Sequence, residues 1–188
     1  MMDGQFLYWG TGKTWRRLAG CALRGDARGS TLIEFAICAP AFIALLLGAA
    51  QIALIYFAQQ TIQTSTEIMA RRLATGEMRQ STMTAAQFRQ ATCATLPAYL
   101  DCAKLIVDAR QAATFGTIDT AMPTFTYDAA GNPTNAQFAT GAANSIVILR
   151  LIYPWSVTRG PLGLDLSNQG SGSRLLTGTM VFKAEAYR

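Results

Sequence analysis

The stretch that decides the fold is RGSTLIEFAICAPAFIALLLGAAQIALIYFA, residues 28–58. From Leu32 to Ala58 the side chains are almost all apolar, and a helix of this length can cross a bilayer with some tilt. Glu34 is the only charged residue in that run. A carboxylate in a membrane helix is costly unless it has a partner, so Glu34 is predicted to be a functional residue.

The residues around the start of the apolar run, RGSTLIEF at 28–35, resemble a type IV prepilin signal of the Flp/Tad kind. In that signal a membrane peptidase cuts after a glycine, and a glutamate is the fifth residue of the mature chain. The resemblance implies a cut between Gly29 and Ser30, which makes Glu34 the fifth residue and places Phe35 in the family's Glu-Phe or Glu-Tyr pair. With its helix, two nearby cysteines and late strands, the wider chain looks like the TadE-like pseudopilins.

The resemblance implies a pseudopilin or minor pilin that a prepilin peptidase matures, and that acts in assembly or priming of a Flp/Tad-type pilus. Cleavage would expose a new ammonium group on Ser30. Glu34, next to Phe35, is the expected subunit-docking residue, because it could pair with that ammonium or with a neighbouring subunit's. The implied partners are the peptidase, other pilins or pseudopilins of the same pilus, the inner-membrane assembly platform and membrane lipid, with no nucleic acid.

Residues 1–29 read as a polar, basic leader. Basic residues before a first membrane span stay in the cytoplasm, which predicts a single pass through a bacterial inner membrane with a periplasmic C-terminal domain. A subunit that enters the fibre would end in the extracellular pilus. A secretory signal peptide has an apolar core of about 7–15 residues with cleavage after it, and this run is longer. An uncleaved signal anchor remains an alternative.

One long helix is predicted over residues 30–76, with its transmembrane segment at about 32–58. Beyond the apolar run, TIQTSTEIMARRLATG keeps apolar residues at helical spacing. Arg71 and Arg72 suit the last turn of a helix, and Gly76 is a natural stop. A lipid or nucleic-acid patch is the weaker interpretation of the two arginines.

Residues 77–188 are predicted to form a periplasmic α+β domain with a disulfide. A short helix should begin at a cap on Thr84 or Ser81 and end at about Thr95. Cys93 and Cys102 follow closely, and outside the cytoplasm such a pair favours a disulfide. A zinc site would need more ligands, and a catalytic thiol would need a base beside it.

Three strands are predicted, at residues 105–110, 145–153 and 175–187. Pro154 is expected to end the second strand, and apolar and polar residues alternate along the third. An antiparallel meander packed on the outer half of the long helix would bury the apolar faces. The fold class is therefore α+β and pilin-like. The loops at 111–143 and 154–174 are long, and the first of them is predicted to face a partner or to be poorly ordered.

Composition argues against an enzyme. The chain has no histidine, the commonest general base and a common metal ligand, so no cofactor is expected. The acidic residues Asp101, Asp108, Asp119 and Asp128 show no metal or acid–base spacing and are interpreted as solvated surface. Two alternatives stay open. One is an uncleaved single-pass scaffold or anchor that binds an envelope partner. The weaker one is a membrane-tethered periplasmic hydrolase, which would require a base that the sequence does not offer unless Lys104 could serve.

Overall fold

The computed structural model describes residues 29–78, 83–119, 121, 124–128, 133–169 and 172–185. The first 28 residues of the predicted leader lie outside this set. The chain divides into two compact units, residues 1–46 and 47–188, and the boundary falls inside the long helix. Each unit is described by itself.

The long helix, α2, runs from Ser30 to Ala74, as predicted. By length and composition it could cross a membrane. Its end follows from the sequence: Gly76 adopts a positive φ of 78°, and its N–H donates to the Leu73 carbonyl at 3.3 Å. A glycine takes this left-handed conformation without steric penalty, so it satisfies a last-turn carbonyl and stops the helix.

A short helix, α3, spans Ala85–Cys93 and has the predicted cap on Thr84. The Thr84 hydroxyl accepts from the Gln87 N–H at 3.2 Å, and the Gln87 side chain accepts from the Thr84 N–H at 2.9 Å. This reciprocal capping box satisfies two backbone donors that a bare helix start leaves free. The helix ends two residues before the predicted Thr95, whose N–H turns back to the Thr92 carbonyl.

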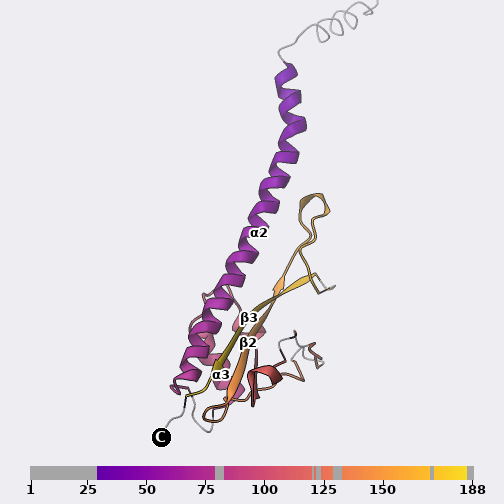
Figure 1. Ribbon diagram of the computed structural model, residues 1–188. Helices are drawn as coiled ribbons and strands as arrows, with labels where there is room; N and C mark the ends of the chain where they lie inside the picture. The colour runs from indigo at the N-terminus through magenta and orange to yellow at the C-terminus, as the bar shows by residue number, and fades with distance from the viewer. Residues whose placement is uncertain are drawn as a thin grey trace, which may run out of the picture. The chain divides into compact units, whose positions relative to one another are not determined.

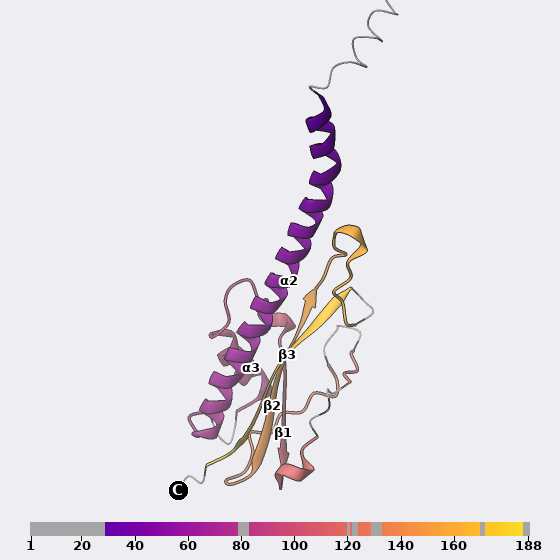
Figure 2. The same ribbon diagram turned by 45° about the horizontal axis from the view of Figure 1, so that its top comes forward.

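The sheet has three antiparallel strands in the order β1-β2-β3 (Figures 1 and 2). They are β1 (Ile106–Ala112), β2 (Ile146–Ser156) and β3 (Ser173–Lys183). In the described residues, single turns of 3₁₀ helix lie at Cys102–Lys104, Phe115–Thr117 and Pro161–Gly163. The predicted α+β class and antiparallel meander are confirmed.

The strand boundaries differ from the prediction, most clearly at the ends of β2 and β3. β2 does not end at Pro154; it continues to Ser156, with Pro154 opposite Leu175 of β3. On the other side of β2, the pairing with β1 stops at Ile152. Pro154 therefore lies where β2 has one neighbouring strand, and an edge position tolerates the missing N–H. β3 ends at Lys183, earlier than predicted.

The core lies between the outer half of α2 and one face of the sheet. The residues that α2 buries there lie three, four or seven positions apart, as one face of a helix requires: Ile55, Ala58, Ile62, Met69 and Leu73. β2 contributes Leu149, Leu151 and Tyr153 to the same cluster. On β3, the predicted alternation holds: Leu176 and Gly178 are buried, and Thr179 between Gly178 and Met180 is exposed.

Gly178 is where α2 comes closest to the sheet. A Cβ atom at this position would lie 2.8 Å from the Ile62 carbonyl oxygen and 2.9 Å from the Thr66 Cβ. Real Cβ atoms do not approach other heavy atoms so closely. The lack of a side chain at Gly178 therefore permits the helix to pack on β3.

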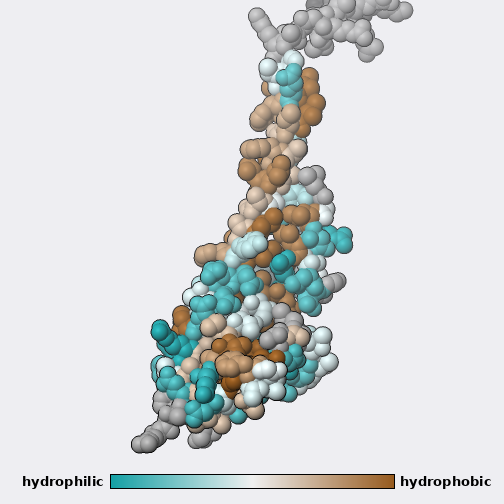
Figure 3. Space-filling view, in the orientation of Figure 1, coloured by the Kyte–Doolittle hydropathy of each residue, from teal (hydrophilic) through white to brown (hydrophobic). Residues whose placement is uncertain are grey.

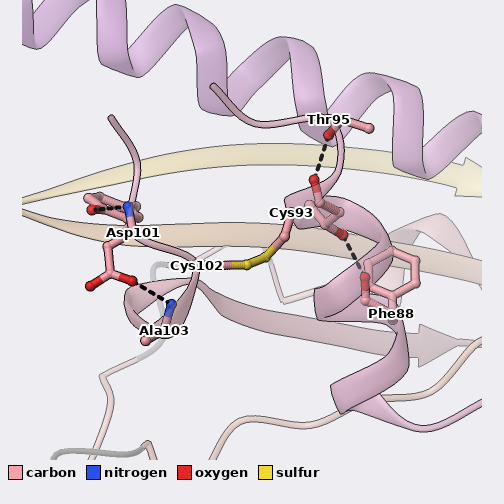
Figure 4. Close-up of a disulfide and its surroundings, with 8 residues drawn as sticks. Phe88, Cys93, Thr95, Asp101, Cys102 and Ala103 are labelled. Atoms are coloured by element: carbon pink, nitrogen blue, oxygen red, sulfur yellow. Dashed lines mark hydrogen bonds between the residues drawn. A yellow bond between two sulfur atoms is a disulfide. The ribbon is translucent and has the colours of Figure 1, made fainter. Parts of the chain in front are cut away.

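The Cys93–Cys102 disulfide is present, and it joins the end of α3 to the 3₁₀ turn that leads into β1 (Figure 4). The two Cα atoms are 5.7 Å apart, which suits a disulfide. Asp101 lies beside it, with its carboxylate accepting from the Ala103 N–H at 3.0 Å. The covalent link closes a short loop in a domain with a small core, where loop closure stabilises the fold by restricting the unfolded chain.

Candidate processing and assembly site

The predicted cleavage point lies at the start of α2. Ser30 is the first residue of the helix, and Gly29 immediately precedes it. Both residues are exposed, and a Cβ atom on Gly29 would have no heavy atom within 4 Å. The peptide bond between them is thus sterically open within the part of the chain that the structure describes.

The structure brings Ser30 and Glu34 together. The Ser30 hydroxyl donates to a Glu34 carboxylate oxygen at 3.2 Å, on the exposed surface of the first turns. The contact follows from the helix, because residues four apart lie on the same face. Phe35 is 73 % exposed, and its position next to Glu34 in the helix sends its side chain in a different direction.

The first half of α2 presents an apolar surface around this polar pair (Figure 3). The exposed large side chains are Leu32, Ile33, Phe35, Ile37, Phe42, Ile43, Leu45, Leu46 and Leu47. Within the described part of this apolar surface, Glu34 is therefore the one carboxylate, and it lies one helical turn from the backbone nitrogen of Ser30. Such an arrangement can hold a cation at the start of the helix.

A family model described as TadE-like protein matches residues 29–71. The match is to the TadE-like family. It begins at Gly29 and includes Ser30, Glu34 and all but the last turn of α2, in agreement with the family resemblance of the N-terminal motif. The match suggests a protein associated with a Tad pilus. No curated protein and no solved structure matches the chain.

The second unit of the chain contains a buried charge cluster that the sequence interpretation missed. Asp108 on β1 is fully buried, so its interpretation as solvated surface is wrong. Its carboxylate accepts from Arg110 at 3.0 and 3.1 Å and from Arg150, directly opposite on β2, at 3.3 Å. The Arg150 side chain is 2 % exposed. A buried carboxylate needs such partners because desolvation disfavours an unpaired charge.

The same cluster ties down the loop between β1 and β2. Arg150 donates to the backbone carbonyls of Asp119 and Ala121, and the Gln137 N–H donates to Asp108 at 3.0 Å. Phe138, next in the chain, packs on Phe88 of α3 with ring centroids 5.3 Å apart. The described parts of this loop are therefore anchored to the sheet and to α3.

A signal for this cluster was present in the sequence. Arg150 is the only charge in SIVILRLIY, and Asp108 is the only charge before Arg110 in LIVDAR. A cation in a strand that is buried on both faces needs a carboxylate on a neighbouring strand, and Asp108 is the candidate that the antiparallel register supplies. Without the register, Asp108 looks like any other surface acid.

Proposed function

We propose that the chain is a pseudopilin or minor pilin whose precursor is cut between Gly29 and Ser30 by a prepilin peptidase. The observation that carries the proposal is the Ser30–Glu34 contact at the exposed start of an apolar helix. The TadE-like match supports it by beginning at Gly29. The activity is assembly or priming of the pilus, and the protein performs no catalysis.

Cleavage would convert the amide nitrogen of Ser30 into an ammonium one helical turn from the Glu34 carboxylate. This cation, or that of a neighbouring subunit, then neutralises Glu34 within the membrane. In a low-dielectric helix bundle the attraction is stronger than at a water-exposed surface, although desolvation of both groups offsets part of it. Glu34 would in this way select a subunit that has been processed and whose N-terminal ammonium lies at the same level as the Glu34 carboxylate.

The proposed topology has the leader in the cytoplasm, α2 in the inner membrane and residues 77–188 in the periplasm. Two observations support this orientation. Basic residues precede the span, and the Cys93–Cys102 disulfide suits an oxidising compartment. The proposed partners are the peptidase, other pilins or pseudopilins, the assembly platform and lipid.

The test is the N-terminal residue of the protein extracted from membranes, determined by intact mass and terminal sequencing. A mature chain that begins at Ser30 supports the proposal. In cells with an active prepilin peptidase, Gly29→Val should leave the precursor uncut, whereas Gly116→Val, in an open position of the outer domain, should leave processing unchanged. A wild-type chain that keeps residues 1–29 would favour an uncleaved membrane anchor instead.

A further inference from the structure

The connection between β2 and β3, residues 157–172, reaches α2 inside the predicted membrane segment. In Figures 1 and 2 it is the orange loop that extends beyond the two strands. A Cβ atom on Gly48 would lie 3.5 Å from the Leu164 Cδ2, an ordinary packing distance. A Cβ atom on Gly160 would lie 2.6 Å from the side-chain oxygen of Gln51. These short distances show that the loop lies against α2 at the level of Gly48 and Gln51.

The loop is closed by its own hydrogen bonds. The Gly160 N–H donates to the Leu164 carbonyl at 2.7 Å, and the Leu164 N–H donates back to the Pro161 carbonyl at 3.3 Å. At the base, the Val157 N–H donates to the Gly172 carbonyl at 2.9 Å. The turn at residues 159–164 therefore has a defined conformation.

The position of this loop conflicts with a hydrocarbon layer that extends along α2 as far as Ala58. Irregular backbone leaves N–H and C=O groups that hydrocarbon cannot satisfy, so a lipid-facing loop does not lie within it. A hydrocarbon layer is about 30 Å thick, which about 20 helical residues span. Counted from Leu32, that length ends near Gln51, seven residues before the apolar run does. Helix length and loop position thus agree on one boundary.

We propose that the outer hydrocarbon boundary lies at Gly48–Gln51 and that the turn at residues 159–164 rests in the lipid headgroup layer. This inference depends on the membrane insertion of α2 that the proposed function includes. Its partner is the bilayer itself, because the turn is continuous with the apolar surface of the membrane helix. The loop then sets how deeply the helix can enter the membrane.

Two side chains fit this layer. Arg159 is exposed on the turn, where its guanidinium can bind lipid phosphate. Tyr56 is 72 % exposed on α2, about 8 Å beyond Gln51, and tyrosine is enriched at membrane–water interfaces.

The test measures the membrane depth of three fluorophores on the full chain. Cys21→Ser and Cys38→Ala remove the two thiols outside the disulfide, and single cysteines are placed at Leu45, Thr158 or Thr179 for an environment-sensitive label. The protein is reconstituted in phosphatidylethanolamine–phosphatidylglycerol vesicles. Lipids with a quencher at the headgroup or deep in the acyl chain are compared with aqueous iodide.

The deep quencher should act on the label at residue 45, the headgroup quencher on the label at 158, and iodide alone on the label at 179. Arg159→Gln should reduce headgroup quenching at 158 without changing the label at 45, and Arg89→Gln, an exposed arginine elsewhere in the domain, should change neither.

Equal iodide quenching of the labels at residues 158 and 179, with the label at residue 45 still quenched from the lipid, would overturn the headgroup contact alone. An iodide-accessible label at 45 would instead remove the membrane insertion on which both proposals depend. A label at 158 that escapes all quenchers and self-quenches more at high protein-to-lipid ratio would show a second copy on the turn, which also overturns the contact.

Discussion

The side-chain amide of Gln59 on α2 pairs with the backbone of Thr177 on β3 in the way that a neighbouring strand would. Its nitrogen donates to the Thr177 carbonyl at 2.8 Å, and its oxygen accepts from the Thr177 N–H at 3.3 Å. One turn later the Gln63 side chain accepts from the Thr179 N–H at 3.3 Å. Four helical residues advance about 6.0 Å and two strand residues about 6.6–6.8 Å, so the two spacings match. The helix thereby covers the open edge of β3.

Replacing Gln59 by alanine should destabilise the outer domain by about 1–3 kcal/mol, because two hydrogen bonds are lost and the backbone groups of an edge strand are left open. Gln59→Glu should lose about as much, since a carboxylate cannot donate to the Thr177 carbonyl. Thermal unfolding of the detergent-solubilised protein measures the change. Gln60→Ala, at an exposed neighbouring position, is the control and should stay within about 0.5 kcal/mol. Equal effects at 59 and 60 would contradict the edge-covering role.

Gly178→Ala should separate α2 from β3. The new Cβ would collide with the backbone carbonyl of Ile62 and with Thr66, and helix backbone cannot move aside as a flexible side chain can. Overpacking of this kind costs about 1–3 kcal/mol. Gly116→Ala, with no atom within 4 Å of the added carbon, is the matched control. Chemical unfolding of both variants in micelles gives the comparison, and an unchanged midpoint for Gly178→Ala would refute the close approach.

Asp108→Asn should be the most destabilising of the charge-neutralising substitutions, by about 3–5 kcal/mol, because it leaves the buried Arg150 guanidinium without its counter-charge. Asp101→Asn is the control, since asparagine can also accept from the Ala103 N–H. Limited proteolysis adds a second measurement. Cleavage within 113–139 should accelerate in the Asp108 variant, and a loop that stays resistant would mean that other contacts hold it.

Glu34→Gln should be processed at the normal site but should not support pilus formation. The amide keeps the size of the side chain and removes the charge that the proposed ammonium pairing requires. Terminal sequencing and counting of pili in a strain that carries the variant measure the two effects separately. Glu67→Gln, an exposed glutamate later in the same helix, should leave both unchanged. Normal piliation with Glu34→Gln would refute the docking role.

Local sequence patterns predicted most of the fold. The apolar run and Gly76 set the bounds of α2 to within two residues, Thr84 marked the start of α3, and the spacing of Cys93 and Cys102 predicted their bond. The Ser30–Glu34 contact also follows from spacing along one helix.

The features that escaped prediction depend on neighbours distant in the chain. Pro154 continues its strand because β1 is too short to reach it, and a proline rule applied to β2 alone cannot include that fact. Asp108 is buried because the register places Arg150 opposite it. Gln59 looks like a polar residue at the end of an apolar helix until β3 is known to lie beside it.

The covering of the β3 edge also determines how the domain responds to a pulling force. Because Gln59 and Gln63 meet Thr177 and Thr179 in the same order along both elements, a load directed along α2 would stretch both contacts at once, in shear. Contacts that are loaded in parallel share the force, whereas contacts that are loaded in series break one after another. A helix drawn out of the membrane would therefore carry its sheet along as a single mechanical body.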